Sequence, residues 1–235
     1  MQRKFRLLLA AASLLTASHH VHADSPALTV PATADIFSAG LDSPIAPGGG
    51  GAGTLPIAIA VSPGQAGFQL SASGSVSQYY EAFFHGPDGL PNYAENITDY
   101  GGISGFVTDQ LMPLTAVFLT DAAAQPPAPA PLDFSSLGLG RDFLTLSPAI
   151  GQVFFVGDGQ TDGGQTQTFY VPSGATRLFL GFPDAVNSLG LPGGYDDNEG
   201  SLQVAVTFVP EPSMPALAAL GVALSGVCPR QKRQS

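Results

Sequence analysis

The stretch that decides the fold is SLQVAVTF, residues 201–208, in which apolar and polar side chains alternate without a break. In an extended chain, successive side chains point to opposite faces of the sheet. One face of this stretch therefore carries four apolar side chains, Leu202, Val204, Val206 and Phe208. A period of two residues with one apolar face predicts a half-buried β-strand.

Short runs rich in β-branched and aromatic residues recur upstream of this strand, separated by glycine and proline. That spacing is typical of many short strands joined by turns. We expect seven further strands, at residues 54–61, 67–77, 114–120, 143–146, 152–156, 167–171 and 176–182. Between the two ends of the chain no long helical period occurs. The expected fold class is therefore all-β, a β-sandwich flanked by an N-terminal signal helix and a C-terminal apolar helix.

The first 23 residues have the pattern of a secretory signal peptide. Arg3, Lys4 and Arg6 precede an apolar run, and Val21 and Ala23 suit cleavage before residue 24. The alternative is a short membrane anchor, but a run of about 11 residues is too short to span about 30 Å of hydrocarbon. We expect cleavage and export.

The last residues, 210–235, form a three-part tail. It begins within VPEPS, residues 209–213, and continues with an apolar run at 214–228 and a basic end with Arg230, Lys232 and Arg233. This order resembles the PEP-CTERM sorting signal of Gram-negative bacteria. The resemblance implies an exosortase substrate, held transiently in the inner membrane by a transmembrane helix until a transpeptidase-like enzyme cleaves near the motif. The protein would then reach the cell surface or the extracellular space.

The tail departs from that family in two ways. Its apolar run has only about 15 residues, or roughly 22 Å as a helix, and its basic end is interrupted. The alternative is a proline-containing linker followed by an amphiphilic segment. In either case the basic residues favour a cytoplasmic location for this end.

Residues 24–209 remain as one exported domain, long enough to bury a core. It contains 17 of the 18 acidic residues but only two basic ones, Arg141 and Arg177. Nucleic acid and anionic lipid both need cationic patches, so we expect neither as a partner. Divalent cations prefer carboxylate oxygens and are compatible with this charge.

Cysteine and histidine chemistry is nearly absent from the domain. The single cysteine, Cys228, lies in the tail, so the domain has neither a disulfide nor a thiolate site. After signal cleavage His85 is the only histidine, which argues against a zinc site of the usual kind. We expect no catalytic role for His85 and no enzyme.

The segment DAVNSLGLPGGYDDNEGS, residues 184–201, is the best candidate for a metal site. Its side-chain oxygens come from Asp184, Asn187, Asp196, Asp197, Asn198 and Glu199. Glycines among them allow tight turns that aim backbone carbonyls inward. Ca²⁺ takes six to eight oxygen ligands from such mixtures, and crowded carboxylates repel one another without a cation.

The same segment resembles the C-terminal motif of the calcium-dependent galactophilic bacterial lectins, which are small jelly-roll, galactose-binding-like sandwiches. The resemblance rests on ATRLFLGFPD at 175–184 and PGGYDDNEGS at 192–201, and weakly on residues 66–89. It implies Asp184 as the first carboxylate ligand, the backbone carbonyl of Gly194, the side chains of Asp197 and Asn198, and a backbone carbonyl near Gln78.

Two departures from the lectin motif weaken the prediction of a sugar site more than the prediction of a metal site. The loop before Pro192 is longer than in the lectins, and GPDGLPNYAEN at 86–96 has no counterpart of their sugar-contacting His/Gln loop. The alternative is an Asp/Asn/Gly-rich hairpin loop that holds no ion.

Three other segments carry weaker signals. GDGQTDGG at 157–164 predicts a hairpin turn between two strands, with Asp158 and Asp162 as a weaker second cation site. Residues 48–53 predict a flexible connection, and the Pro/Ala-rich residues 122–132 predict an exposed loop.

These features favour a non-catalytic binding protein of the cell surface or extracellular matrix, with Ca²⁺-dependent binding of a glycan such as an exopolysaccharide or a galactoside. A purely structural envelope or biofilm protein is the first alternative. A glycan-active hydrolase is the second, but no pair of carboxylates is singled out by its spacing and tryptophan is absent.

Overall fold

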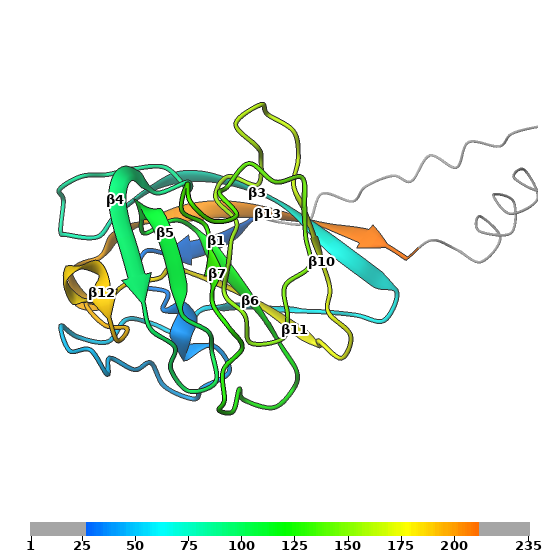
Figure 1. Cartoon of the computed structure of the whole chain (residues 1–235), viewed down its shortest axis with the longest axis horizontal. Coiled ribbons are helices and arrows are strands. Elements are labelled where there is room, and N and C mark those ends of the chain that lie inside the picture. The colour runs from blue at the N-terminus through cyan, green and yellow to red at the C-terminus, as the bar shows by residue number, and fades with distance from the viewer. Residues whose placement is uncertain (1–26, 212–235) are drawn as a thin grey trace, which may run out of the picture.

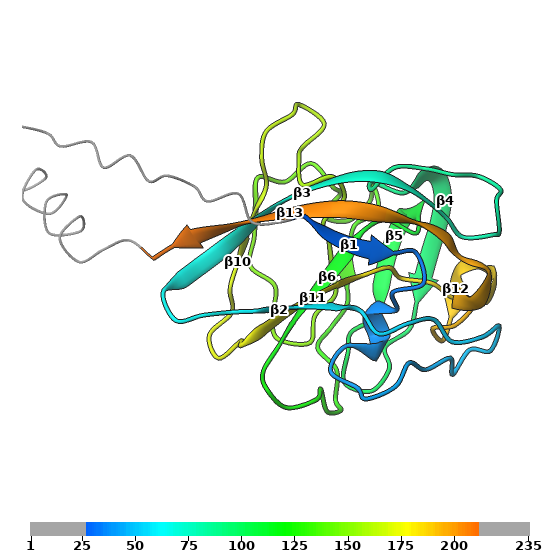
Figure 2. The ribbon, with the colours of Figure 1, turned by 180° about the vertical axis from the view of Figure 1, so that it is seen from behind.

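Within the described residues nearly all of the regular secondary structure is β-strand, joined by turns and loops (Figures 1 and 2). The computed structural model describes residues 27–211, so the expected signal peptide and nearly all of the expected tail lie outside the described residues. In chain order the elements are β1 (Leu28–Pro31), η1 (Ile36–Ser38), β2 (Ile57–Ala60), β3 (Gln65–Ser77), β4 (Leu90–Ile97), β5 (Phe106–Leu111), β6 (Thr115–Leu119), β7 (Leu132–Asp133), β8 (Thr145–Leu146), β9 (Phe154–Phe155), β10 (Thr168–Tyr170), β11 (Arg177–Gly181), η2 (Val186–Ser188), β12 (Leu189–Gly190), η3 (Tyr195–Asp197) and β13 (Glu199–Pro210). The η elements are single 3₁₀ turns.

The strands form three sheets in a β-sandwich-like arrangement. One sheet has the order β1-β13-β3-β10-β8, the second β2-β11-β6-β9, and the third β12-β4-β5-β7. The ribbon of β3 and β13 runs over β6 and β11 in both overall views (Figures 1 and 2). The all-β prediction is confirmed.

Each of the eight expected strands overlaps a strand of the structure, and five further strands were not expected. These are β1, β4, β5, β7 and β12. The hairpin predicted at residues 157–164 is present only as a local turn. Gln160 and Thr166 form an antiparallel bridge, but β9 and β10 do not pair with each other. β9 pairs with β6, whereas β10 pairs with β3 and β8, so the two flanking strands lie in different sheets.

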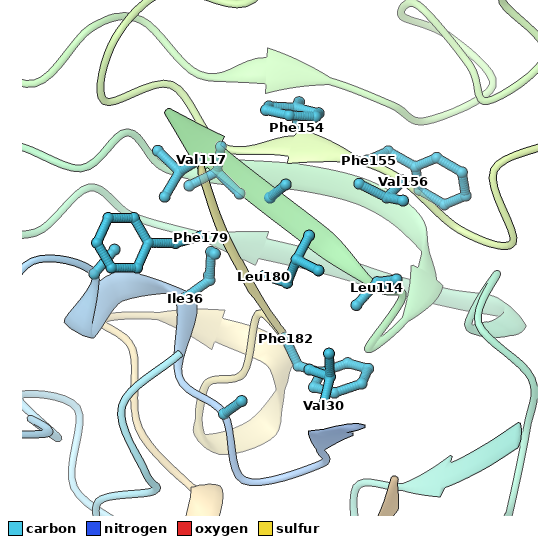
Figure 3. Close-up of a cluster of buried hydrophobic side chains, with 14 of the residues drawn as sticks. Val30, Ile36, Leu114, Val117, Phe154, Phe155, Val156, Phe179, Leu180 and Phe182 are labelled. Carbon is cyan, nitrogen blue, oxygen red and sulfur yellow. The ribbon is translucent and has the colours of Figure 1, made fainter. Parts of the chain in front are cut away.

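The core lies between the sheets and is rich in phenylalanine. From the decisive strand, Leu202 and Val204 are fully buried and Val206 nearly so. Figure 3 shows the part of the core where β6, β9 and β11 meet η1, with Phe154, Leu180 and Ile36 among the side chains that fill it. Burying apolar area is the main stabilising contribution to such a fold, at about 25 cal/mol per Å².

The antiparallel pair β3–β13 sets the long dimension of the fold. Its register runs from Glu199 opposite Ser77 at one end to Pro210 opposite Gln65 at the other. At that second end the Glu211 N–H donates to the Gly64 carbonyl, 2.9 Å away. No helix within residues 27–211 is long and apolar enough to cross a membrane.

Candidate functional site

Three segments that are distant in sequence meet at the side chain of Asp184. Because Ser77 lies opposite Glu199 in the β3–β13 pair, the residues that flank this pair, Gln78 and Asn198, come together at its end. Asp184 lies three residues after the end of β11. Its Oδ1 accepts a hydrogen bond from Gln78 Nε2 at 2.5 Å, and its Oδ2 accepts one from Asn198 Nδ2 at 2.8 Å.

The Asp184 carboxyl group is buried, with a residue exposure of 1%. Burial disfavours the charged form of an acid, and here it raises the pKa of Asp184 to about 8, despite the two amide donors. The nearby charge of Asp197 makes a smaller contribution to this raised pKa. Without a cation, this carboxyl group is therefore largely protonated at neutral pH.

Gly194 passes close to the same carboxylate. Its φ of 86° is left-handed, which glycine adopts without steric penalty. A Cβ at this position would lie 3.7 Å from Asp184 Oδ1, so the backbone of Gly194 borders the site. Its N–H donates to the Gly49 carbonyl at 3.0 Å.

The glycine-rich residues 48–53, predicted as a flexible connection, form one wall of this region. Besides the bond from Gly194, the Gly48 N–H donates to the Pro192 carbonyl at 2.8 Å, and the Tyr195 N–H donates to the Gly51 carbonyl at 3.3 Å. A Cβ on Gly51 would collide with the Asp196 side chain. The two glycine-rich loops therefore need each other's lack of side chains to pack.

Asp197, another of the expected metal ligands, lies in the short turn η3. Its side chain is partly exposed and its pKa is raised, first by burial and then by the charge of Asp196. Its backbone carbonyl accepts a hydrogen bond from the Tyr80 N–H at 2.7 Å. This bond connects the loop around Asp197 to the turn that follows β3.

The chemistry of the residues around Asp184 fits a hard cation. Asn198 Oδ1 is buried and has no hydrogen-bond partner within residues 27–211, although Nδ2 of the same amide contacts Asp184. Within the same residues there is no group of three or more His, Cys, Asp or Glu side chains placed to hold a metal ion. A cation here would therefore need amide and backbone oxygens as well as carboxylates, a mixture that Ca²⁺ accepts.

Two more buried acids lie near Asp184. Asp35, which is fully buried, accepts hydrogen bonds from the Phe37 N–H at 2.8 Å and from the Ser38 hydroxyl. Glu95 is also fully buried, and neither of its oxygens has a hydrogen-bond partner of normal geometry among the described residues. The Met112 backbone is close enough to favour the charged form of Glu95 slightly. Burial raises the pKa of both acids, and for Glu95 the charge of Asp184 adds to it.

Within the part of the chain that the structure describes, no basic side chain offsets these acids. Among residues 27–211, both ion pairs belong to Arg141, which contacts Asp88 and Asp162. Arg177 instead donates to backbone carbonyls, those of Thr120 and Ala122. A buried carboxylate without a positive partner is unfavourable, so these acids must hold protons or meet a cation from solution.

A cavity of about 380 Å³ opens beside Asp184, and we call it the Asp184 pocket. Its polar wall includes Gln78, Asp184, Gly194, Asp196 and Asp197. Four of the five predicted metal-site residues therefore line one cavity. The fifth, Asn198, does not line it but donates a hydrogen bond to Asp184. Gln78 was expected to contribute a backbone carbonyl, but the contact seen is made by its side chain.

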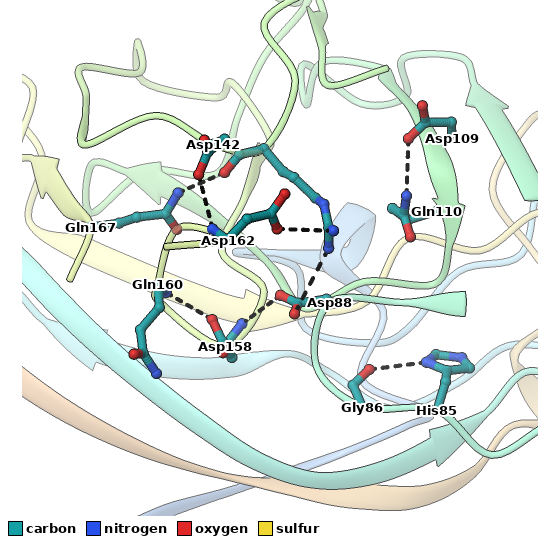
Figure 4. A network of polar contacts seen from close by, with 11 residues as sticks. His85, Gly86, Asp88, Asp109, Gln110, Asp142, Asp158, Gln160, Asp162 and Gln167 are labelled. Atoms are coloured by element: carbon teal, nitrogen blue, oxygen red, sulfur yellow. Dashed lines mark hydrogen bonds and ion pairs between the residues drawn. The ribbon is translucent and has the colours of Figure 1, made fainter. Parts of the chain in front are cut away.

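A second acidic region contains Asp88, Asp158 and Asp162, which lie close together (Figure 4). These residues and Arg141 line a cavity of about 300 Å³, which we call the Arg141 pocket. Arg141 lies 3.0 Å from Asp162 and 3.9 Å from Asp88. Asp88 also accepts a hydrogen bond from the Asp158 N–H at 3.0 Å. The two residues predicted as a weaker cation site, Asp158 and Asp162, thus share their surroundings with a resident positive charge.

His85 is buried and pairs with Val76 of β3. Its Nδ1 is 3.0 Å from the Gly86 carbonyl oxygen (Figure 4), and its Nε2 is buried without a hydrogen-bond partner among the described residues. Burial lowers the pKa of the imidazole, so the ring is neutral. No carboxylate within residues 27–211 hydrogen-bonds to it.

Sequence reasoning missed two contributors to this region, Asp35 and Glu95. No local sequence pattern singled out Asp35. Glu95 did have such a pattern, because it stands two residues before Ile97 in β4, and both side chains point inward. The turn η2, which also lines the Asp184 pocket, lies in the lengthened loop noted above.

Comparison of the sequence with protein-family models finds no match, and comparison with curated proteins finds none either.

Proposed function

We propose that the described fold is a non-catalytic, Ca²⁺-dependent carbohydrate-binding domain of the jelly-roll, galactose-binding-like kind. The observation that carries this proposal is the meeting of Gln78, Gly194, Asp197 and Asn198 around one buried carboxylate, that of Asp184. The residues come from three separate segments. Among residues 27–211 no basic side chain pairs with Asp184, so a metal cation is the partner that would favour its ionised form.

In this proposal Ca²⁺ is held by the Asp184 carboxylate, the side chains of Asp197 and Asn198, and the backbone carbonyls of Gly194 and of the residues near Gln78. A bound Ca²⁺ supplies two things: a positive charge for the buried acids, and open coordination positions for the hydroxyl groups of a sugar. The cavity beside Asp184 gives those hydroxyl groups room to approach.

We further propose that the domain acts outside the inner membrane, after export by the N-terminal signal and transient anchoring by the PEP-CTERM-like tail. The length of β13 is consistent with a site that lies far from the membrane anchor. The site lies before Glu199, and the tail follows Pro210 at the other end of the same strand (Figure 1). At about 3.3 Å per residue, the strand separates the two by about 40 Å, so an anchored protein would present its site away from the attachment point.

Thermal melts of the purified full-length protein, in EDTA and in millimolar Ca²⁺, test the cation. A ligand that binds only the folded state stabilises it by RT ln(1 + [L]/Kd), about 2.7 kcal/mol at a hundredfold excess over Kd. We expect the double variant Asp184→Ala/Asp197→Ala to lose this stabilisation, with Asp158→Ala/Asp162→Ala as the matched control that keeps it. A melting temperature of the native sequence that ignores Ca²⁺ would refute the site.

A glycan array probed in Ca²⁺ and in EDTA then tests the ligand. We expect binding to neutral glycans that disappears in EDTA. Stabilisation by Ca²⁺ without binding to any glycan would leave a calcium-stabilised structural protein of the envelope or biofilm in place of the lectin-like function.

A further inference from the structure

A second cavity adjoins the Asp184 pocket and differs from it in chemistry. This aromatic pocket has a volume of about 370 Å³ and shares Gln78, Tyr79, Asn187 and Ser188 with the Asp184 pocket as a common wall. Its remaining wall is made of Phe83, Tyr93, Leu90 and Leu111. All of its lining residues are neutral, whereas the Asp184 pocket contains three carboxylates.

The aromatic side chains at this pocket are unusually exposed. Phe83 is 67% exposed, Tyr79 60% and Tyr93 51%. Single exposed apolar residues are common, but several large aromatic residues gathered around one cavity indicate a binding surface. Flat rings with polar groups at the rim suit a pyranose, which has an apolar C–H face and hydroxyl groups at its edge.

The turn between β3 and β4 carries Tyr79 and Phe83, and parts of its backbone are held in a strained conformation. Tyr80 and Phe83 have φ values of 43° and 60°, in the left-handed region that aromatic residues rarely occupy. The turn is nevertheless tied down, since Val76 and His85 exchange two backbone hydrogen bonds of 3.0 Å and the Ser77 hydroxyl donates to the Ala82 carbonyl. Strain that the surrounding structure enforces is common at ligand clamps.

The turn is also connected to the loop of the Asp184 pocket. The Tyr80 N–H donates to the Asp197 carbonyl at 2.7 Å, so any cation that orders Asp197 also orders the aromatic turn. The two cavities therefore have four wall residues in common, and one backbone hydrogen bond connects the segments that line them.

We propose that the aromatic pocket is a second sugar subsite, which receives the ring next to the one bound at the Asp184 pocket. The ligand of the domain is then an oligosaccharide of at least two units, with a neutral ring at the aromatic pocket, rather than a single terminal sugar. This inference rests on the proposed function and extends it. The neutral lining and the acidic domain together exclude an anionic sugar at this position.

The test compares variants of the purified full-length protein on an array of neutral oligosaccharides of one to six units, in millimolar Ca²⁺. Phe83→Ala and Tyr93→Ala should weaken binding to glycans of two or more units roughly tenfold, because each removes an aromatic face. Binding of single sugars and the rise in melting temperature with Ca²⁺ should stay unchanged. Tyr170→Ala is the matched control, because Tyr170 is an exposed aromatic residue on β10 beside Gly67, near the other end of β3.

Three outcomes would overturn the subsite. The first is a native protein that binds single sugars as tightly as longer glycans. The second is unchanged binding of longer glycans by Phe83→Ala and Tyr93→Ala. The third is self-association of the native protein that both variants abolish while glycan binding persists, which would identify a polypeptide-docking surface. By contrast, aromatic-dependent glycan binding with no response to Ca²⁺ would refute the cation and leave the subsite standing.

Discussion

The Asp184 pocket and the Arg141 pocket are both built from acidic, glycine-rich loops, yet they differ in how their carboxylates are neutralised. In the Arg141 pocket the carboxylates lie near solvent, and Arg141 pairs with Asp88 and Asp162. At the Asp184 pocket the carboxylate is buried and meets only neutral amide donors. One region carries its own counter-charge, and the other must take up either protons or a metal ion.

This comparison shows why counting acidic residues in a loop does not locate a cation site. GDGQTDGG and PGGYDDNEGS look alike in composition. What separates them is burial and the position of a single arginine, and both depend on tertiary structure. The predictions that follow change one region while the other serves as its control.

The largest expected effect is on pH dependence in EDTA. The unfolded Asp184 ionises near pH 4, whereas its folded pKa is about 8. Between these values the unfolded state binds fewer protons, so stability falls as pH rises, by up to about 1.4 kcal/mol per pH unit. Below pH 4 and above pH 8 the contribution of this group is constant.

Urea unfolding of the full-length protein in EDTA between pH 4 and pH 9 measures this effect. Asp184→Asn should remove a decline on the order of a few kcal/mol, while Asp162→Asn should leave it in place. In saturating Ca²⁺ the native sequence should lose most of the decline, because the metal binds the ionised form. An Asp184→Asn variant with the same pH profile as the native sequence would show that Asp184 ionises normally.

A smaller effect is expected when one acid from each region is replaced by leucine. Glu95→Leu removes a buried carboxyl group without a hydrogen-bond partner and should raise stability in EDTA by about 1–3 kcal/mol. Asp162→Leu removes a partner of Arg141 and should lower stability by at most about 1 kcal/mol, because the pair is exposed. The same sign for both variants would show that the two regions do not differ in the way described.

The sequence predicted the strands and the polar loop because both are local patterns. Alternation in residues 201–208 directly shows which side chains face inward, and all eight expected strands are present. The positions of Asp184, Gly194, Asp197 and Asn198 followed from a resemblance over short motifs, and the structure brings these residues together. It also brings Gln78 to them, through its side chain.

What the sequence could not reveal depends on contacts between distant segments. Glycines 48–51 read as a flexible connection, because nothing local indicates that they pack against residues 192–196. The hairpin expected at residues 157–164 forms only a local turn, because the two apolar runs beside it enter different sheets. The aromatic pocket needs Phe83 and Tyr93 from two segments, and only the fold brings these together.

The smallest effect on stability is expected from truncation after Glu211. β13 ends at Pro210 and the Glu211 N–H is bonded to the Gly64 carbonyl, so removal of residues 212–235 leaves the described fold complete. The melting temperature should stay the same. Fractionation of the producing bacterium should nevertheless change, with the intact precursor found in the inner membrane and the truncated protein released. Identical fractionation of the two forms would argue against a sorting role for the tail.

The most direct test of the central claim is a crystal structure of the protein grown in millimolar Ca²⁺, with the ion located by its anomalous scattering. The account predicts one strong peak in the Asp184 pocket, about 2.3–2.6 Å from oxygens of Asp184, Asp197 and Asn198 and from the Gly194 carbonyl. A peak between Asp158 and Asp162 with none at Asp184, or no peak at all in crystals saturated with Ca²⁺, would contradict it.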